Sequence, residues 1–286
     1  MPRGGTPVSQ LRRLRAELKT LREDLGQTQK DVADALEWSS SKVIRIENGP
    51  VGISITDLKA LLFHYKVTDD QRVDDLLELA RGSKQPAWWH RFKDVYSAKF
   101  LTFLGLESSA IRIRQFQQML VPGLLQSPEY MRALLKSYGN SPEVIERGAA
   151  VRSERQRVVM VENNVETYFI VDESVLHRLI GDEWVMRGQL LHLKELAGKP
   201  NVSIQVVPFT AGVHRGLASS FEIFQLSEQE DDYAMVVELP YQDRLIEESN
   251  EETKDYVAIF AELEKVALSP EDSLVLIDRL LGKLPG

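Results

Sequence analysis

Near the N-terminus, apolar residues recur every three to four positions, which is the spacing of amphipathic helices. The first series consists of Leu11, Leu14, Leu18, Leu21 and Leu25. Ser9 is the expected N-cap of this helix and Gly26 its stop, and residues 1–8 are expected to form a flexible leader. Four further helices are predicted at about residues 28–36, 39–48, 54–65 and 69–80. Five short helices so close together predict a compact all-α domain over residues 9–81.

The pattern changes after a small polar segment at residues 82–90, which is the expected linker. Residues 94–140 are predicted to be mainly helical, and a basic helix is predicted at 142–161. Alternating apolar residues predict four strands, at Glu166–Val171, Val202–Val207, Ser220–Leu226 and Ala234–Leu239. Further helices are expected at Ser174–Ile180, Val185–Ala197, 249–267 and 271–281. Residues 91–286 are therefore predicted to form an α+β domain, with a small sheet packed by helices.

The composition narrows the class of protein. With 43% hydrophobic and 27% charged residues, it is typical of a soluble globular protein. Because the chain has no cysteine, it can form neither disulfides nor thiolate metal sites. The sequence shows no apolar run of about 18 residues and no signal-peptide core, so a cytoplasmic protein without membrane attachment is expected.

The net charge of −8 is unevenly distributed along the chain. Residues 1–48 hold nine Lys/Arg and seven Asp/Glu, whereas residues 228–264 hold thirteen Asp/Glu and only two basic residues, Arg244 and Lys254. The acidic stretch is interpreted as a solvated face, which would repel phosphate. Any nucleic-acid surface is therefore expected at the N-terminus.

Residues 28–48 combine a helix, a tight turn and a second helix whose first turn is small, polar and basic. A helix-turn-helix protein places side chains in the major groove of DNA in this way. Arg45 is the best candidate for a bidentate contact to guanine, and Gln29 is expected to reach a backbone phosphate from a helix N-terminus. The candidate DNA-contacting residues are Gln29, Lys30, Ser39, Ser40, Ser41, Lys42 and Arg45. The predicted fold class is an all-α five-helix helix-turn-helix domain followed by the α+β domain.

Residues 9–80 resemble the Cro/CI-type, or xenobiotic-response-element, family of helix-turn-helix repressors from phages and bacteria. The residues that carry the resemblance are Thr28-Gln29, Val32-Ala33, Ser41, Val43 and Ile46-Glu47-Asn48-Gly49. The resemblance implies an ion pair between Arg22 and Glu47 that ties the first helix to the recognition helix. Removal of one partner would leave an uncompensated charge. The alternative is a five-helix domain that serves only protein contacts.

Residues 100–245 resemble a domain of uncertain role in actinobacterial regulators that are described as antitoxin-like. The resemblance rests on Leu106-Glu107, Ile111-Arg112, Val121–Tyr130, Val171–Leu176, Gln189-Leu190, Asn201–Phe209, Gly212 and His214. Members of that family are commonly encoded beside a very small partner protein. The resemblance implies a repressor whose C-terminal domain senses either that small protein or a ligand.

The candidate partner- or ligand-contacting residues are Trp88, Trp89, Arg152, Arg155 and His214. The two tryptophans form either an aromatic plug that ties the linker to the second domain or a stacking surface for a ligand or nucleobase. The basic helix is either a solvated, internally salt-bridged face or a binding surface for an anionic ligand, an acidic protein or the acidic stretch 228–264. The segment Pro208–Gly216 is either a hairpin connection or a lid over a pocket.

The sequence contains no residue spacing typical of a metal site or a phosphate-binding loop, so no enzyme activity and no cofactor are expected. Asp172, Glu173 and His177 are interpreted as a helix N-terminal acid pair with a surface histidine, rather than as a catalytic group. The first hypothesis is a homodimeric transcriptional regulator, a repressor, that binds double-stranded DNA at paired half-sites. The alternative is an antitoxin-like interaction module that neutralises a small partner protein, with DNA binding only autoregulatory.

Overall fold

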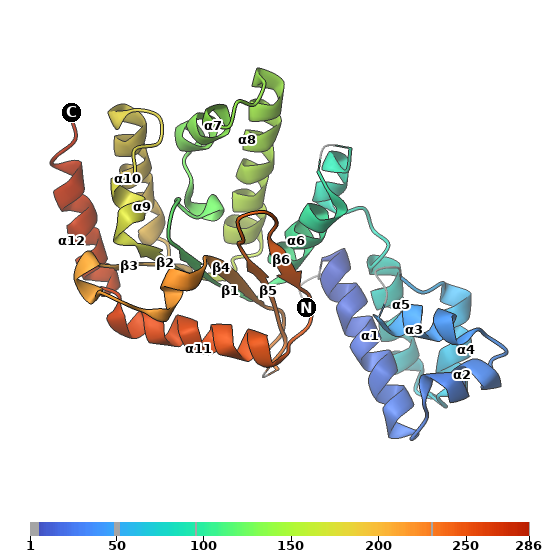
Figure 1. The fold of residues 1–286 in the computed structure, drawn as a ribbon. Helices are drawn as coiled ribbons and strands as arrows, with labels where there is room; N and C mark the ends of the chain where they lie inside the picture. The colour runs from blue at the N-terminus through green and yellow to red at the C-terminus, as the bar shows by residue number, and fades with distance from the viewer. Residues whose placement is uncertain (1–5, 49–51, 95, 230, 286) are drawn as a thin grey trace. The chain divides into compact units, whose positions relative to one another are not determined.

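The chain folds into two compact units, and the division between them falls after Lys93, a few residues beyond the predicted linker at 82–90. A computed structural model describes residues 6–48, 52–94, 96–229 and 231–285. Figure 1 shows the elements of each unit. Residues 1–5 of the predicted leader, and Gly49 of the repressor-like motif, lie outside the described residues.

The described part of the first unit consists of short helices around one apolar core. Its elements are α1 (Pro7–Asp24), α2 (Gln29–Ala35), α3 (Ser40–Asn48), α4 (Ile55–His64), α5 (Asp70–Gly82) and the 3₁₀-helix η1 (Trp88–Phe92). The largest fully buried side chains of the core are Leu14, Leu18, Leu58, Leu61, Leu62 and Leu76. The five predicted helices are present, so the prediction of an all-α domain is confirmed.

The first helix begins earlier than predicted. The side chain of Thr6, and not that of Ser9, caps α1, since Thr6 Oγ1 accepts a hydrogen bond from the backbone N–H of Ser9 at 3.2 Å. Pro7 occupies the first helical position, where its fixed backbone angle favours a helix and its missing N–H costs nothing. The part of the predicted leader at residues 7–8 is therefore helical.

The turn between α2 and α3 is defined by local hydrogen bonds. Thr28 and Asp31 form a reciprocal capping box at the start of α2. Ser39 Oγ accepts from the backbone N–H of Lys42 at 3.2 Å, which caps α3. Between them, Glu37 adopts a positive φ of 55°, a conformation that reverses the chain after α2. Four residues thus separate the two helices, as the helix-turn-helix prediction requires.

In the described residues, the second unit is a mixed six-stranded sheet with helices on both faces (Figure 1). Its strands are β1 (Arg112–Gln117), β2 (Glu166–Asp172), β3 (Val202–Val207), β4 (Phe221–Gln225), β5 (Tyr233–Val237) and β6 (Arg244–Ile246). Its α-helices are α6 (Ala98–Ser109), α7 (Pro128–Ser137), α8 (Pro142–Gln156), α9 (Glu173–His177), α10 (Glu183–Ala197), α11 (Glu251–Val266) and α12 (Pro270–Leu281). The prediction of an α+β domain is confirmed.

The strand order is β3-β2-β1-β4-β5-β6, with β1 to β3 parallel and β4 to β6 antiparallel. The expectation of a mainly helical segment at 94–140 is wrong at β1, which lies in the middle of the sheet. In β1 only Ile113 and Phe116 are apolar and the other four residues are arginine or glutamine, so the strand lacks the continuous apolar run that marks a buried strand. The segment Pro208–Gly216 is not a hairpin connection, because β3 and β4 are not neighbours.

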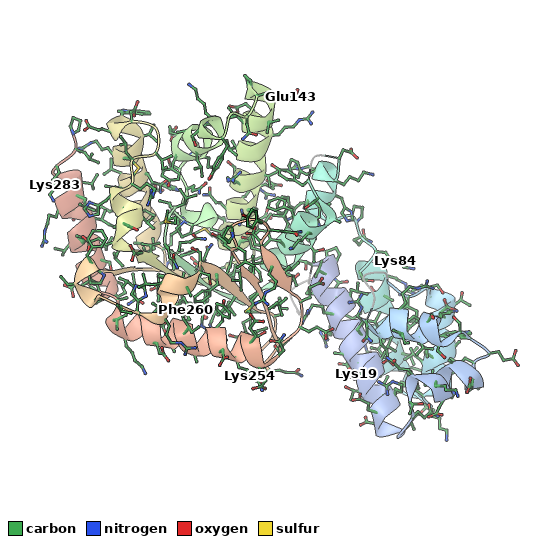
Figure 2. The ribbon with its side chains drawn as sticks, viewed as in Figure 1. Lys19, Lys84, Glu143, Lys254, Phe260 and Lys283 are labelled. Atoms are coloured by element: carbon green, nitrogen blue, oxygen red, sulfur yellow. The ribbon has the colours of Figure 1, made fainter. Side chains whose placement is uncertain are left out.

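The two faces of the sheet differ in polarity. One face is apolar and packs against α11. Phe260 of that helix points toward the sheet, where it joins a core cluster with Phe116, Ile223 and Met235 (Figure 2). Helices α6, α7, α8 and α10 lie on the other side (Figure 1). There the strands place buried polar residues, Gln115, Gln117 and Glu222, among apolar ones, and the register pairs Gln115 with Glu222. This polar group forms one wall of the cavity described below.

Candidate functional site

The third helix exposes one side and buries the other, as a recognition helix requires. The exposed residues of α3 are Ser40, Ser41, Ile44, Arg45 and Asn48. Its buried residues are Val43, Ile46 and Glu47. Positions 41, 44, 45 and 48 are three or four residues apart and so share one face of the helix. That face combines hydroxyl, apolar and guanidinium groups, which are the groups that recognise base edges.

Arg45 is the strongest base-reading candidate on this face. Its side chain is exposed, and among the described residues no hydrogen-bond or salt-bridge partner is found for it. All five of its guanidinium N–H groups are therefore available to a ligand outside the domain. Ser40 and Ser41 are likewise exposed in the first turn of the helix, and Lys30 is exposed in the first turn of α2.

Lys42 has partners within the first unit. Its ammonium forms a salt bridge with Asp57 of α4 (Nζ–Oδ1, 2.6 Å) and lies 3.6 Å from the centre of the Trp38 ring. Burial opposes the charged form of Asp57, but the hydrogen bonds with Lys42 and Ser54 and the nearby positive charges together outweigh it and lower the pKa of that carboxyl. The charge of Lys42 is therefore compensated within the domain, where the residue holds α3 against α4, and its contact with DNA stays a prediction.

The ion pair that the resemblance implied is present in the structure. Glu47 accepts hydrogen bonds from Arg22 Nε at 2.8 Å and from Arg22 Nη2 at 3.0 Å. Both side chains are buried, and Arg22 Nη1 also donates to the carbonyl oxygen of Gln27 at 2.8 Å. The hydrogen bond to Glu47 raises the pKa of Arg22. This bidentate pair joins the end of α1 to the end of α3 and fixes the orientation of the recognition helix.

Gln29 belongs to the same network. Its side-chain Nε2 donates to Glu47 Oε2 at 2.7 Å, so α1, α2 and α3 all meet at one carboxylate. One of the two amide hydrogens of Gln29 is thus used inside the domain, and its contact with a DNA phosphate stays a prediction. Tertiary packing provides this internal partner, because Gln29 and Glu47 belong to different helices.

In the second unit, the arginines of the basic helix are paired with glutamates, with one exception. Arg147 pairs with Glu143 at 2.8 Å, and Arg157 with Glu154 at 2.9 Å. Arg155 is buried and forms a bidentate pair with Glu107 of α6, at 2.8 and 2.5 Å. Burial opposes the charge on Arg155, but Glu107 outweighs it and raises the pKa of the guanidinium. For Arg152, the described part of the chain offers no carboxylate within salt-bridge distance.

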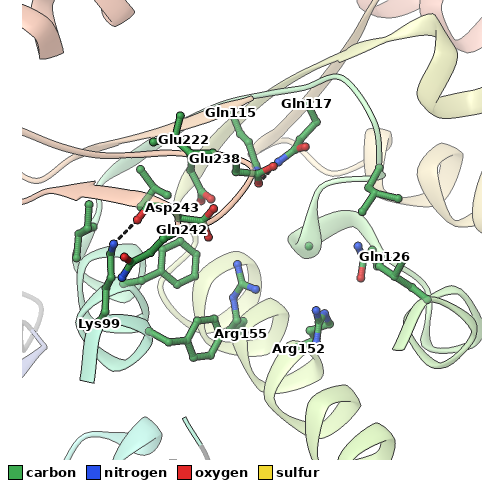
Figure 3. Close-up of a pocket in the computed structure, with 18 of the residues that line it drawn as sticks. Lys99, Gln115, Gln117, Gln126, Arg152, Arg155, Glu222, Glu238, Gln242 and Asp243 are labelled. Atoms are coloured by element: carbon green, nitrogen blue, oxygen red, sulfur yellow. Dashed lines mark hydrogen bonds between the residues drawn. The ribbon is translucent and has the colours of Figure 1, made fainter. Parts of the chain in front are cut away.

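Arg152 and Arg155 lie at a cavity of about 550 Å³ (Figure 3). Both extend from α8 toward the sheet, where the polar side chains of β1, β4 and the end of β5 form the opposite wall. The labelled lining residues are Lys99, Gln115, Gln117, Gln126, Arg152, Arg155, Glu222, Glu238, Gln242 and Asp243. The structure thus brings together two of the five predicted partner or ligand residues.

The other three predicted residues lie elsewhere. Trp88 and Trp89 belong to the first unit, where their rings pack edge to face at 5.6 Å, and neither lines the cavity. His214 also does not line it. Its side chain is only 7% exposed, packs against Phe116, and has its Nε2 atom 3.9 Å from Asp172 Oδ2. The prediction that His214 contacts a partner is therefore corrected, because the fold buries this side chain.

The acid pair at the start of α9 has structural partners. Asp172 caps the helix by accepting from the backbone N–H of Ser174 at 2.9 Å, and Glu173 accepts from the backbone N–H of Phe209 at 2.7 Å. His177 lies 3.3 Å from Glu173, one helical turn away. These contacts support the interpretation of the pair as a helix N-terminus.

Sequence reasoning missed two sets of residues. Ile44 was detectable, because a helical period of 3.6 places it between Ser41 and Arg45 on the exposed face. The cavity wall formed by Gln115, Gln117 and Glu222 carries a weaker signal, a polar residue at an inward position of a strand. That signal becomes visible only when the strand and its buried face are known.

Two family models match the chain. Residues 13–76 match a helix-turn-helix domain, and residues 100–279 match a domain of unknown function, DUF5753. The second match covers more than half of the chain. The chain belongs to the DUF5753 family. Within it, the DUF5753 domain supplies all of the cavity lining except Ser97 and Lys99, and the helix-turn-helix domain contains α2 and α3.

A helix-turn-helix domain is typical of DNA-binding regulators, and its presence supports that class for this DUF5753 chain. The comparisons with curated proteins and with solved structures found no match. Among the residues that the structure describes, no helix is both long and apolar enough to cross a membrane. In those same residues no group of three or more His, Asp or Glu side chains is arranged to hold a metal ion.

Proposed function

We propose that this protein is a sequence-specific DNA-binding transcriptional regulator that places α3 in the major groove. The observation that carries the proposal is the exposed face of α3, where Arg45 stands unpaired among the described residues beside Ser41 and Ile44. The buried network of Arg22, Gln29 and Glu47 supports it, because a base-reading helix must be held rigidly on its domain.

The proposal includes a Cro/CI-type repressor that acts as a cytoplasmic homodimer. A single domain of this size buries little DNA surface, so affinity would come from two half-sites about one helical turn apart. The DUF5753 domain would control DNA binding by sensing a small molecule or a small partner protein. It would act by binding rather than by catalysis.

The test is binding of the full-length protein to DNA from upstream of its own gene and to random DNA of equal length, over a series of salt concentrations. Tight, selective binding with a steep negative salt dependence is expected, since phosphate contacts release counterions. Weak binding that is equal on both DNAs would contradict the proposal.

Two matched arginine variants sharpen this test. Arg45→Ala should lose about 1–3 kcal/mol on the specific DNA and much less on random DNA, because a bidentate contact to guanine carries specificity. Arg81→Ala is the control, since Arg81 is an exposed arginine on α5, outside the helix-turn-helix. Equal losses on both DNAs for Arg45→Ala, or equal behaviour of the two variants, would refute the role of Arg45.

A further inference from the structure

The cavity of the second unit has the size of a small-molecule site. Its volume of about 550 Å³ lies within the roughly 300–1,000 Å³ typical of pockets for small organic ligands. One wall is α8, the opposite wall is the polar patch on the sheet, and α6 supplies aromatic side chains (Figure 3). Such a mixture of apolar surface and a few convergent polar groups is characteristic of ligand pockets.

Arg152 provides the first indication of the ligand. Its side chain is partly buried, and within the described chain its guanidinium makes one long hydrogen bond, to the carbonyl oxygen of Gly148 at 3.5 Å. Burial and the neighbouring Arg155 lower the pKa of Arg152, which means that the surroundings destabilise its charged form. The other arginines of this helix have glutamate partners. A guanidinium that lines a cavity without an acidic partner is suited to an anionic ligand.

Gln126 provides the second indication. It is only 4% exposed, and its Nε2 donates to the carbonyl oxygen of Val121 at 2.8 Å, which orients the amide. Its Oε1 is buried with no hydrogen-bond partner among the described residues. Folded proteins satisfy most buried acceptors, so this amide oxygen, in a residue that lines the cavity, would be stabilised by a donor that a ligand supplies.

Glu222 adds a third group on the opposite wall. Its Oε1 is also buried and unpartnered within the described chain. Burial, assisted by Glu107, raises the pKa of Glu222 well above its ordinary value, which favours the neutral form of the carboxyl. A neutral carboxyl can donate as well as accept a hydrogen bond, and it does not repel an anion.

The charges of the lining favour a ligand of low negative charge over a dianion. Arg155 is already neutralised by Glu107, which leaves Lys99 and Arg152 as cations. The carboxyl groups of Glu238 and Asp243 line the same cavity and offset these two cations, so a dianion such as a phosphate monoester is disfavoured.

We propose that this cavity binds a small organic carboxylate that also carries an N–H or O–H donor. The carboxylate lies against Arg152, the donor reaches Gln126 Oε1, and an apolar or aromatic body lies against Phe100 and Phe103. The existence of the site is independent of DNA binding, whereas its use as a control of DNA binding rests on the function proposed above.

The test is isothermal titration calorimetry of the full-length protein with a panel of acids: salicylate, para-hydroxyphenylacetate, indole acetate and phenylalanine. Each is compared with its primary amide, and phenyl phosphate and inorganic phosphate serve as dianionic probes. At least one carboxylate is expected to bind, with its amide and the phosphates weaker by tenfold or more. No binding by any carboxylate, or tighter binding by an amide or a phosphate, would overturn the proposal.

Variants then assign the contact. Arg152→Gln should lower the affinity for the carboxylate by about tenfold to a hundredfold, as expected for loss of a charge-assisted hydrogen bond. Arg147→Gln is the matched control, because Arg147 is exposed on the same helix and paired with Glu143. Arg152→Lys keeps the charge without the planar fork and should bind with intermediate affinity. Equal binding by Arg152→Gln and Arg147→Gln would overturn the assignment.

A measurement without ligand separates a binding role from a structural one. Arg152→Met is expected to raise the melting temperature of the ligand-free protein, because it removes a partly buried charge that lacks an acidic partner. A clear fall would show that Arg152 is structural and would overturn the proposal. DNA binding is measured on the same preparations. Acid binding without DNA binding would leave this site intact and refute the proposed function, and the reverse result would refute only this site.

Discussion

Substitution of Glu47 by alanine is expected to destabilise the first unit strongly. The carboxylate of Glu47 is 2% exposed and accepts three hydrogen bonds, two from Arg22 and one from Gln29. In Glu47→Ala the guanidinium of Arg22 stays buried, and among the described contacts it keeps the carbonyl of Gln27 and a long contact to the exposed Glu23. The variant therefore leaves a buried charge without its main partner.

The expected loss is about 3–5 kcal/mol, the usual cost of removing one partner of a buried pair. This is a large part of the roughly 5–15 kcal/mol that stabilises a typical domain. Two matched variants bracket the value. Glu23→Ala removes an exposed carboxylate 3.4 Å from the same guanidinium and should cost about 1 kcal/mol or less. The double variant Arg22→Met/Glu47→Leu removes both charges and should recover most of the loss.

Native-state hydrogen exchange of the full-length protein, read by mass spectrometry, measures this cost for each unit separately. In Glu47→Ala, exchange from α1 and α3 should accelerate by about two to three and a half orders of magnitude, which corresponds to the expected free energy at roughly 1.4 kcal/mol per tenfold. Peptides from the second unit serve as the internal reference. An acceleration below about tenfold, or a double variant as unstable as Glu47→Ala, would refute the assignment of a buried ion pair that stabilises the domain.

Three further outcomes are expected. Lys42→Ala should change DNA affinity less than Arg45→Ala in a salt-series binding assay, because Lys42 is already paired with Asp57; a fall of about one in the salt slope would contradict this. Ile44→Ala should reduce affinity for the specific DNA by about tenfold or less at unchanged melting temperature, and an unchanged affinity would remove Ile44 from the recognition face. Burial raises the pKa of Glu222 above its ordinary value of 4.5, so near that pH the folded protein binds a proton that the unfolded chain releases. The free energy of unfolding should therefore fall as the pH rises above about 4.5. Glu222→Gln should flatten this dependence in thermal melts at several pH values. Parallel pH profiles for wild type and variant would contradict that shift.

Much of the first unit was predictable because its signals are local. Helical spacing, capping residues and the stop at Gly26 act within a few residues, so the five helices and the exposed position of Arg45 follow from the sequence alone. The N-cap of α1 was misplaced by three residues, beside a proline that favours either a leader or a first helical turn.

The partners of Lys42 and Gln29 within the first unit depend on the packing between helices. Both residues lie in the segment that predicts DNA contact, yet Lys42 pairs with Asp57 and Gln29 donates to Glu47. A charge or an amide near a recognition helix has several possible partners in the sequence. Only the tertiary arrangement brings one of them within hydrogen-bond distance.

In the second unit, the sequence by itself determined the fold class and most of the helices and strands, because apolar periodicity reports which faces are buried. The tertiary structure decided the central position of β1 and the cavity beside it. Arg155 forms its hydrogen bonds with Glu107, which is 48 residues earlier in the chain. Gln117 donates a hydrogen bond to Glu238, which is 121 residues later. Strand pairing and buried charge pairs join distant segments of the chain. The polar residues of β1 therefore line a cavity with charged and polar groups only when the chain is folded.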